Sequence, residues 1–210
     1  MKKSHILPNA YRLYVKPDAG FYIGILASFI VGGIFAAVFA LTLPELTCKE
    51  LLLYLDDFFQ NISRQGADSA VLFKTGLLLH AKNFGFLFLF SVMVVGAPFI
   101  AGFAAVKGFM HCFTLFFLFR MYGIRAAAFT AAGMLPHYLL LMPCYLIVCA
   151  VCLKFSVQLF RERYDMRKKL PRFILALAGL LCLAVMSSLL QAYVEPVLIR
   201  LIAGLYITPA

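Results

Sequence analysis

The strongest constraint on this chain is an uninterrupted apolar run over residues 21–43, which contains no Asp, Glu, Lys or Arg. At about 1.5 Å per residue, a helix of this length crosses the hydrocarbon core of a bilayer, which is roughly 30 Å thick. Hydrophobic residues make up 64% of the sequence and charged residues only 13%, too little charge to cover a soluble domain. Residues 21–43 are therefore predicted to form the first of several transmembrane spans.

Four further apolar stretches predict the remaining spans, at residues 84–105, 109–119, 135–155 and 173–193. The stretch 109–119 gives only about 18–20 Å of helix before Arg120, so the third span is expected to be short or tilted. Gly123 permits a break, and residues 126–134 are expected to form a half-helix that re-enters the membrane edge. The predicted fold class is all-α, a polytopic membrane bundle of about five transmembrane helices.

The distribution of basic residues predicts the orientation, because Lys and Arg in short loops mark the cytoplasmic side. The most basic loop contains Arg161, Arg163, Arg167, Lys168, Lys169 and Arg172. We predict one membrane domain over 1–210, with a cytoplasmic N-terminus (1–20), an extracytoplasmic segment (44–82), a cytoplasmic loop (156–172) and an extracytoplasmic C-terminal segment (194–210). The net charge of +10 is concentrated at these boundaries, so contact with anionic lipid headgroups is expected, and not with nucleic acid.

One face of the first span carries small residues at every fourth position. These are Gly24, Ser28, Gly32, Ala36 and Ala40. Small side chains let the backbones of two membrane helices approach closely. This ridge is expected to pack against another span.

The extracytoplasmic segment contains an amphipathic helix that ends near Gly66. Thr47 and Glu50 fit a capping box at its start. The candidate partner-binding residues are an apolar face of Leu51, Leu55, Phe58 and Ile62 and an acidic edge of Asp56 and Asp57. The helix is expected either to lie flat on the membrane or to dock a partner protein.

Several residues within the spans predict kinks and turns. They are Gly96 and Pro98 in the middle of the second span, a turn at Lys107 and Gly108, and Pro136, His137 and Pro143 in the fourth span. Pro136 suits the first turn of a helix, whereas an internal Pro removes a backbone hydrogen bond. His137 is expected to hydrogen-bond a carbonyl freed on a neighbouring helix, and Lys107, Arg120 and Arg125 to reach headgroups.

The sequence offers no constellation for catalysis. It has no G-x-S-x-G motif, and no Asp or Glu lies within any predicted span. His80, His111 and His137 lack the helical spacing of metal ligands, and the C-x-x-C of Cys149 and Cys152 is expected to serve packing. No catalytic residue, metal or cofactor is therefore predicted.

Short motifs in a fixed order are similar to the stage II sporulation protein M family of endospore-forming Firmicutes. They are LYLDDFFQN at 53–61, HAK at 80–82, VGAP at 95–98, KG at 107–108, MYG at 121–123 and LPH at 135–137, with Pro143 following. The resemblance covers roughly residues 21–161. Tyr138 and Leu141 stand where the wider family often has a glycine and a glutamate, so a role based on an intramembrane carboxylate is not expected.

This resemblance implies a non-enzymatic scaffold for the peptidoglycan-remodelling complex that drives forespore engulfment during sporulation. It implies a location in the mother-cell membrane at the sporulation septum. The implied partners are membrane lipids and the stage II sporulation proteins D and P, which are cell-wall hydrolases. The resemblance leaves open whether the protein forms a homo-oligomer. The residues alone also allow a small-molecule transporter or permease subunit, in which Pro98 and Pro143 would mark broken helices.

Overall fold

The computed structural model describes residues 19–65, 69–93, 95–124, 130, 135–161 and 166–198, with the side chains of 56–65, 135, 161 and 166–169 left aside. Its elements are α2 (Ala19–Thr42), α3 (Glu45–Gln65), α4 (Ser69–Val92), α5 (Gly96–Tyr122), α7 (Leu135–Arg161), α8 (Met166–Leu189) and the π-helical turn η2 (Leu190–Val194). Five helices in this part of the chain are long and apolar enough to cross a membrane. The prediction of an all-α polytopic bundle is confirmed.

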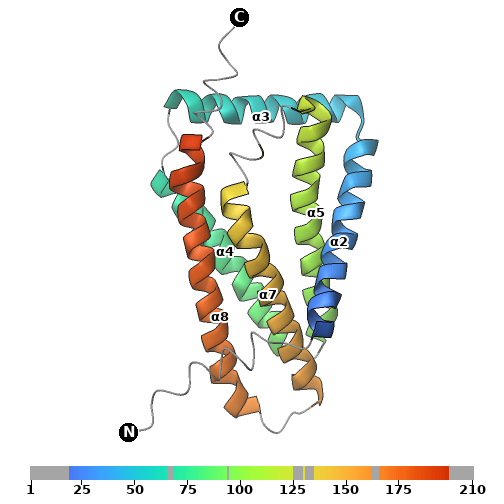
Figure 1. Cartoon of the computed structure of the whole chain (residues 1–210), viewed down its shortest axis with the longest axis vertical. Helices are drawn as coiled ribbons and strands as arrows, with labels where there is room; N and C mark the ends of the chain where they lie inside the picture. The colour runs from blue at the N-terminus through green and yellow to red at the C-terminus, as the bar shows by residue number, and fades with distance from the viewer. Residues whose placement is uncertain are drawn as a thin grey trace, which may run out of the picture.

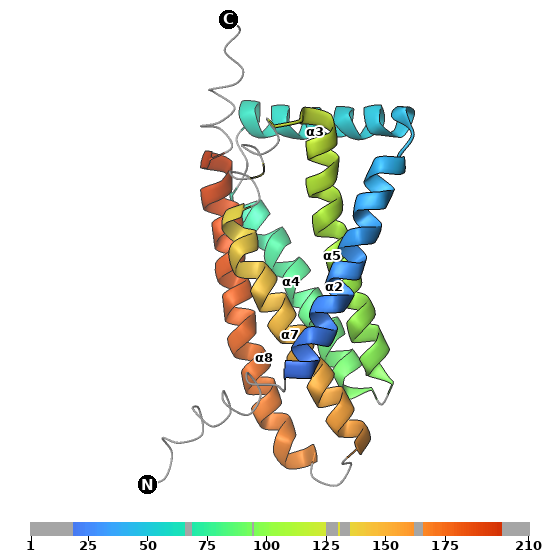
Figure 2. The same ribbon diagram turned by 45° about the vertical axis from the view of Figure 1, so that its right-hand side comes forward.

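The five long helices run side by side along the long axis of the molecule, and α3 lies across one end (Figure 1). We call this the α3 end. The opposite end holds the start of α2, the turn between α4 and α5, the end of α7 and the start of α8, as the second view also shows (Figure 2). Arg167, Lys168 and Lys169, in the first turn of α8, thus belong to the end opposite α3.

The second and third spans differ from the prediction, because the chain turns near Met93 and Val95 and not at Lys107 and Gly108. Residues 69–82, expected outside the membrane, form the first half of α4. Gly96 allows the tight turn, since a Cβ there would lie 2.7 Å from the carbonyl carbon of Phe90. Pro98 lies in the first turn of α5 and does not kink a span, because the N–H groups of a first turn have no partner within the helix. Residues 126–134, predicted to re-enter, lie outside the described residues except Thr130.

The second half of the small-residue ridge of α2 packs against α5, as predicted, whereas Gly24 at its start is exposed. Gly32, Ala36 and Ala40 are buried. A Cβ on Gly32 would lie 2.7 Å from the carbonyl carbon of Ala105, so only glycine permits this backbone approach. Gly108, predicted to form a turn, meets the backbone of Phe29 in the same way.

The fourth span, α7, lies at the centre of the bundle and contacts α2, α4, α5 and α8. Pro136 lies in its first turn, as expected, and the helix continues through Pro143. Cys149 and Cys152 are buried and carry free thiols, which agrees with their predicted role in packing. Since α5 begins at Gly96 and α7 runs through Pro143, neither is a broken helix within the described residues.

Candidate functional site

The amphipathic helix α3 turns part of its predicted apolar face toward the protein. Leu51 and Leu55 are half-buried, whereas Leu53 and Tyr54 are 66% and 73% exposed. The helix begins at Glu45, so the predicted capping box is wrong: Thr47 and Glu50 already lie within the first turns. The other predicted partner-binding residues belong to α3 by their backbone, but their side chains are outside the described set. These residues are Asp56, Asp57, Phe58 and Ile62.

A polar network that the sequence did not predict lies among the long helices. The Tyr145 hydroxyl on α7 is 2.9 Å from Nδ1 of His80 and accepts a 2.8 Å hydrogen bond from Nδ2 of Asn83, both on α4. His80, Asn83 and Tyr145 are all buried. The spacing of His80 and Asn83, three residues apart on one helix face, is the signal that could have indicated this network.

Lys107 lies within α5, next to this network, and its side chain is half-buried. Its ammonium nitrogen is 5.1 Å from the ring centroid of Tyr145 and 5.4 Å from that of Phe103. A cation over aromatic rings gains about 0.5–2 kcal/mol, depending on how far it is withdrawn from water. The two rings therefore stabilise the Lys107 ammonium at this place.

His111 lies one turn beyond Lys107 on the same helix. Its Nδ1 donates a 2.6 Å hydrogen bond to the carbonyl oxygen of Lys107. Its Nε2 is buried and has no partner among the described residues, and the same is true of Nε2 of His80. Two buried imidazole nitrogens without partners are unusual, because buried polar atoms are nearly always hydrogen-bonded.

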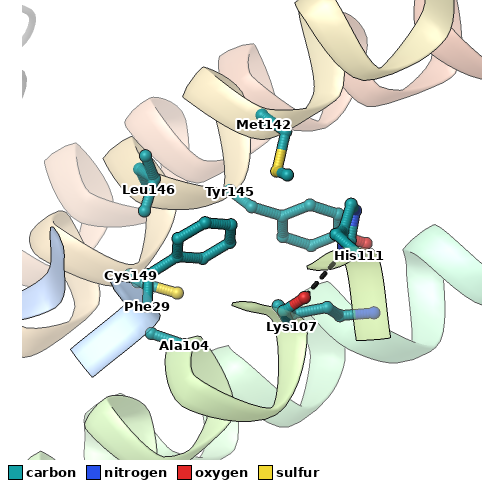
Figure 3. A pocket seen from close by; sticks show the side chains of 8 residues that line it. All are labelled: Phe29, Ala104, Lys107, His111, Met142, Tyr145, Leu146 and Cys149. Carbon is teal, nitrogen blue, oxygen red and sulfur yellow. Dashed lines mark hydrogen bonds between the residues drawn. The ribbon is translucent and has the colours of Figure 1, made fainter. Parts of the chain in front are cut away.

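A small cavity of about 10 Å³ opens beside these side chains. Lys107, His111 and Tyr145 line it together with the apolar side chains of Phe29 and Met142 (Figure 3). The space is about the size of one water molecule, but its walls are apolar, and a buried water also needs polar partners. An organic substrate does not fit.

A buried ion pair joins the fourth and fifth spans at the α3 end. Nδ1 of His137 on α7 contacts a carboxylate oxygen of Glu195, and both side chains are 7% exposed. The Ser187 hydroxyl donates a 3.2 Å hydrogen bond to the carbonyl oxygen of His137. Two predictions are thus wrong: His137 pairs with a carboxylate and not with a freed carbonyl, and the bundle does contain a buried carboxylate.

Glu195 was expected beyond the membrane, because the fifth span was predicted to end at Tyr193, whereas the apolar helical segment reaches Leu198. The π-helical turn η2 directly precedes Glu195, whose backbone N–H bonds to the carbonyl of Leu190, five residues back. Such turns hold one more residue than an α-helical turn and often occur at functional positions. Here η2 sets the direction in which the Glu195 side chain points from the helix.

Arg120, which was predicted to reach headgroups, joins two helices. Its guanidinium donates hydrogen bonds to the carbonyl oxygens of Ala40 and, at 3.2 Å, Leu43. These carbonyls belong to the end of α2, where helical partners are missing. Arg125 lies outside the described residues.

The comparison with protein families agrees with the motif order in the sequence. A family model described as stage II sporulation protein M matches residues 25–196. No curated protein and no solved structure matches the chain.

Proposed function

We propose that this chain, which belongs to the stage II sporulation protein M family, is a non-enzymatic scaffold for the peptidoglycan-remodelling complex that drives forespore engulfment. The family match and the five long apolar helices make it a multi-pass membrane protein of sporulation. We further propose that its partners are the cell-wall hydrolases known as stage II sporulation proteins D and P. We also propose that it is located in the mother-cell membrane at the septum.

The observation that carries this proposal is the position of α3 across one end of the bundle (Figure 1). We propose that this end is extracytoplasmic, because the basic first turn of α8, with Arg167, Lys168 and Lys169, lies at the opposite end. A hydrolase acting on the cell wall would then meet α3 first. The exposed side chains of Leu53 and Tyr54 offer apolar area for such a contact.

The acidic edge of α3 favours a protein partner over lipid. By helical spacing, Asp57 falls on the same face as Leu53 and Glu50, four and seven residues before it. Carboxylates are repelled by an anionic membrane surface but pair with a basic patch on a protein. We therefore assign the docking surface to the face that carries Asp57.

The test is the double variant Asp56→Lys, Asp57→Lys in a sporulating host. We expect the protein to remain inserted and abundant, but to lose co-purification of the two hydrolases and to block engulfment. The control is Glu162→Lys with Asp165→Lys, which makes the same charge change in the basic loop. Unchanged co-purification in the first variant, at normal protein levels, would show that the partners bind elsewhere.

A further inference from the structure

Helix α4 buries one face and exposes the other. His80 and Asn83 lie on the buried face, where they reach Tyr145 on α7. Lys82 is two positions after His80, which turns it about 200° around the helix and out of the bundle. The exposed residues along the middle of α4, which we call the Lys82 face, are Leu78, Ala81, Lys82, Gly85, Phe86 and Leu89.

Lys82 lies near the middle of its span, far from both ends of the helix. Ten residues separate it from Val92 and thirteen from Ser69, which corresponds to about 15 Å and about 20 Å of helix. The turn that follows α4 brings no aqueous boundary closer, because residues 83–106 contain no charged side chain. Lysines that reach the headgroups lie near the ends of membrane helices, so an ammonium group at this depth needs a partner beside it.

The described residues offer Lys82 no anionic partner within the membrane. Their ion pair joins His137 to Glu195, and both of these side chains are 7% exposed. The five described spans contain no other Asp or Glu. A second copy of the chain would therefore bring no free carboxylate, and a twofold contact through α4 would set lysine against lysine. The anion has to come from a different chain.

The surface beside Lys82 has room for the backbone of another helix. Ala81 and Gly85 are exposed, and a Cβ at Gly85 would meet nothing within 4 Å. Small residues such as these let two membrane helices approach closely. The larger apolar side chains of Leu78, Phe86 and Leu89 are each more than half exposed around them. The Lys82 face therefore combines a cation with an apolar surface that a helix can pack against.

We infer that the Lys82 face docks one transmembrane helix of a partner protein, and that this helix carries an Asp or Glu in the middle of its apolar span. The carboxylate pairs with Lys82, and the partner backbone lies against Ala81 and Gly85. Charge complementarity selects this occupant, because lipid tails and the described spans of a second copy both lack a free anion at this depth. The face lies within the membrane, apart from α3, so the inference does not depend on the scaffold proposal.

The test uses the purified full-length protein in phosphatidylcholine vesicles, with synthetic transmembrane peptides as probes. Each peptide has about 20 leucine and alanine residues with Glu, Gln or Leu at the centre. Energy transfer from a dye on the peptide to a dye at the N-terminus of the protein measures binding. We expect the Glu peptide to bind at least about tenfold more tightly than the Leu peptide, or about 1.4 kcal/mol, with the Gln peptide in between. Equal binding of the Glu and Leu peptides would overturn the inference and leave lipid as the occupant.

Three variants of the protein locate the binding. Lys82→Met keeps the length of the side chain and should abolish the preference for the Glu peptide. The matched control is Lys74→Met, at an exposed lysine five residues from the start of α4, which should keep the preference. Lys82→Glu should instead favour a peptide with a central lysine, a gain of binding that a misfolded protein would not give.

Two outcomes with these variants contradict the inference. A preference for the Glu peptide that survives in Lys82→Met would place the partner helix on another face. Energy transfer between two labelled copies of the protein, lost in Lys82→Met, would assign the face to a second copy.

Discussion

The contact between α2 and α5 can be tested at a single glycine, by the substitution Gly32→Leu. A Cβ at Gly32 would lie 2.7 Å from the carbonyl carbon of Ala105 and 2.9 Å from its Cα, and still closer to the carbonyl oxygen. Ordinary contacts of a Cβ begin near 3.4 Å. Because the obstacle is backbone and not a flexible side chain, the two helices must move apart.

The cost follows from what this separation disturbs. Overpacking a well-packed contact costs about 1–3 kcal/mol, and leucine adds three further carbons beyond the Cβ. Separation also strains the hydrogen bonds from Arg120 on α5 to the end of α2, and a hydrogen bond to a charged group contributes about 1.5–3 kcal/mol. We expect a loss of about 3 kcal/mol or more, which lowers the ratio of folded to unfolded protein by a factor above about 100.

The matched control is Gly24→Leu, eight residues earlier on the same helix. A Cβ there meets nothing within 4 Å, so this variant should unfold like the native protein or slightly later, since leucine favours the helix over glycine by about 1 kcal/mol. The assay is the midpoint of denaturant unfolding in mild detergent, together with the amount of protein in the membrane. Equal stability of the two variants would refute the backbone contact between α2 and α5.

Two further predictions concern the His137–Glu195 pair and the orientation. Glu195→Leu leaves His137 buried without its partner and should lower the free energy of unfolding by about 3 kcal/mol, whereas the double variant His137→Leu, Glu195→Leu should recover most of this loss. The thermal unfolding midpoints of the two variants check this, and an unaffected single variant would show that the pair contributes no stability. A cysteine at position 63 (Ser63→Cys) should react with an impermeant reagent on intact cells, and a cysteine at position 4 (Ser4→Cys) should not; the reverse result would invert the predicted topology.

The spans that the sequence predicted well are those in which apolar residues run without interruption. The first, fourth and fifth are the most apolar of the five, whereas α4 and α5 are less so. Their polar residues, such as His80 and Lys107, resemble loop or turn residues until their partners are known. A local pattern cannot show that Tyr145, on another helix, compensates for burying His80.

The same limit explains what was missed at the site. His137 and Glu195 are 58 positions apart, and His80 and Tyr145 are 65 apart. Each of these residues is unremarkable in its own segment, and only the packing of α4, α7 and α8 brings them together. The small-residue ridge of α2, by contrast, could be predicted, because every fourth residue of a helix already lies on one face.

The π-helical turn before Glu195 has a consequence for the length of the fifth helix. This turn holds one residue more than an α-helical turn, and the extra residue is absorbed within Leu190–Val194. Deleting one residue there would leave a continuous α-helix with Glu195 still on the side of His137. Inserting one more residue would rotate Glu195 by about 100°, the turn that each residue of an α-helix makes. The fifth helix can therefore lose one residue at this point and keep the pair, but it cannot gain one.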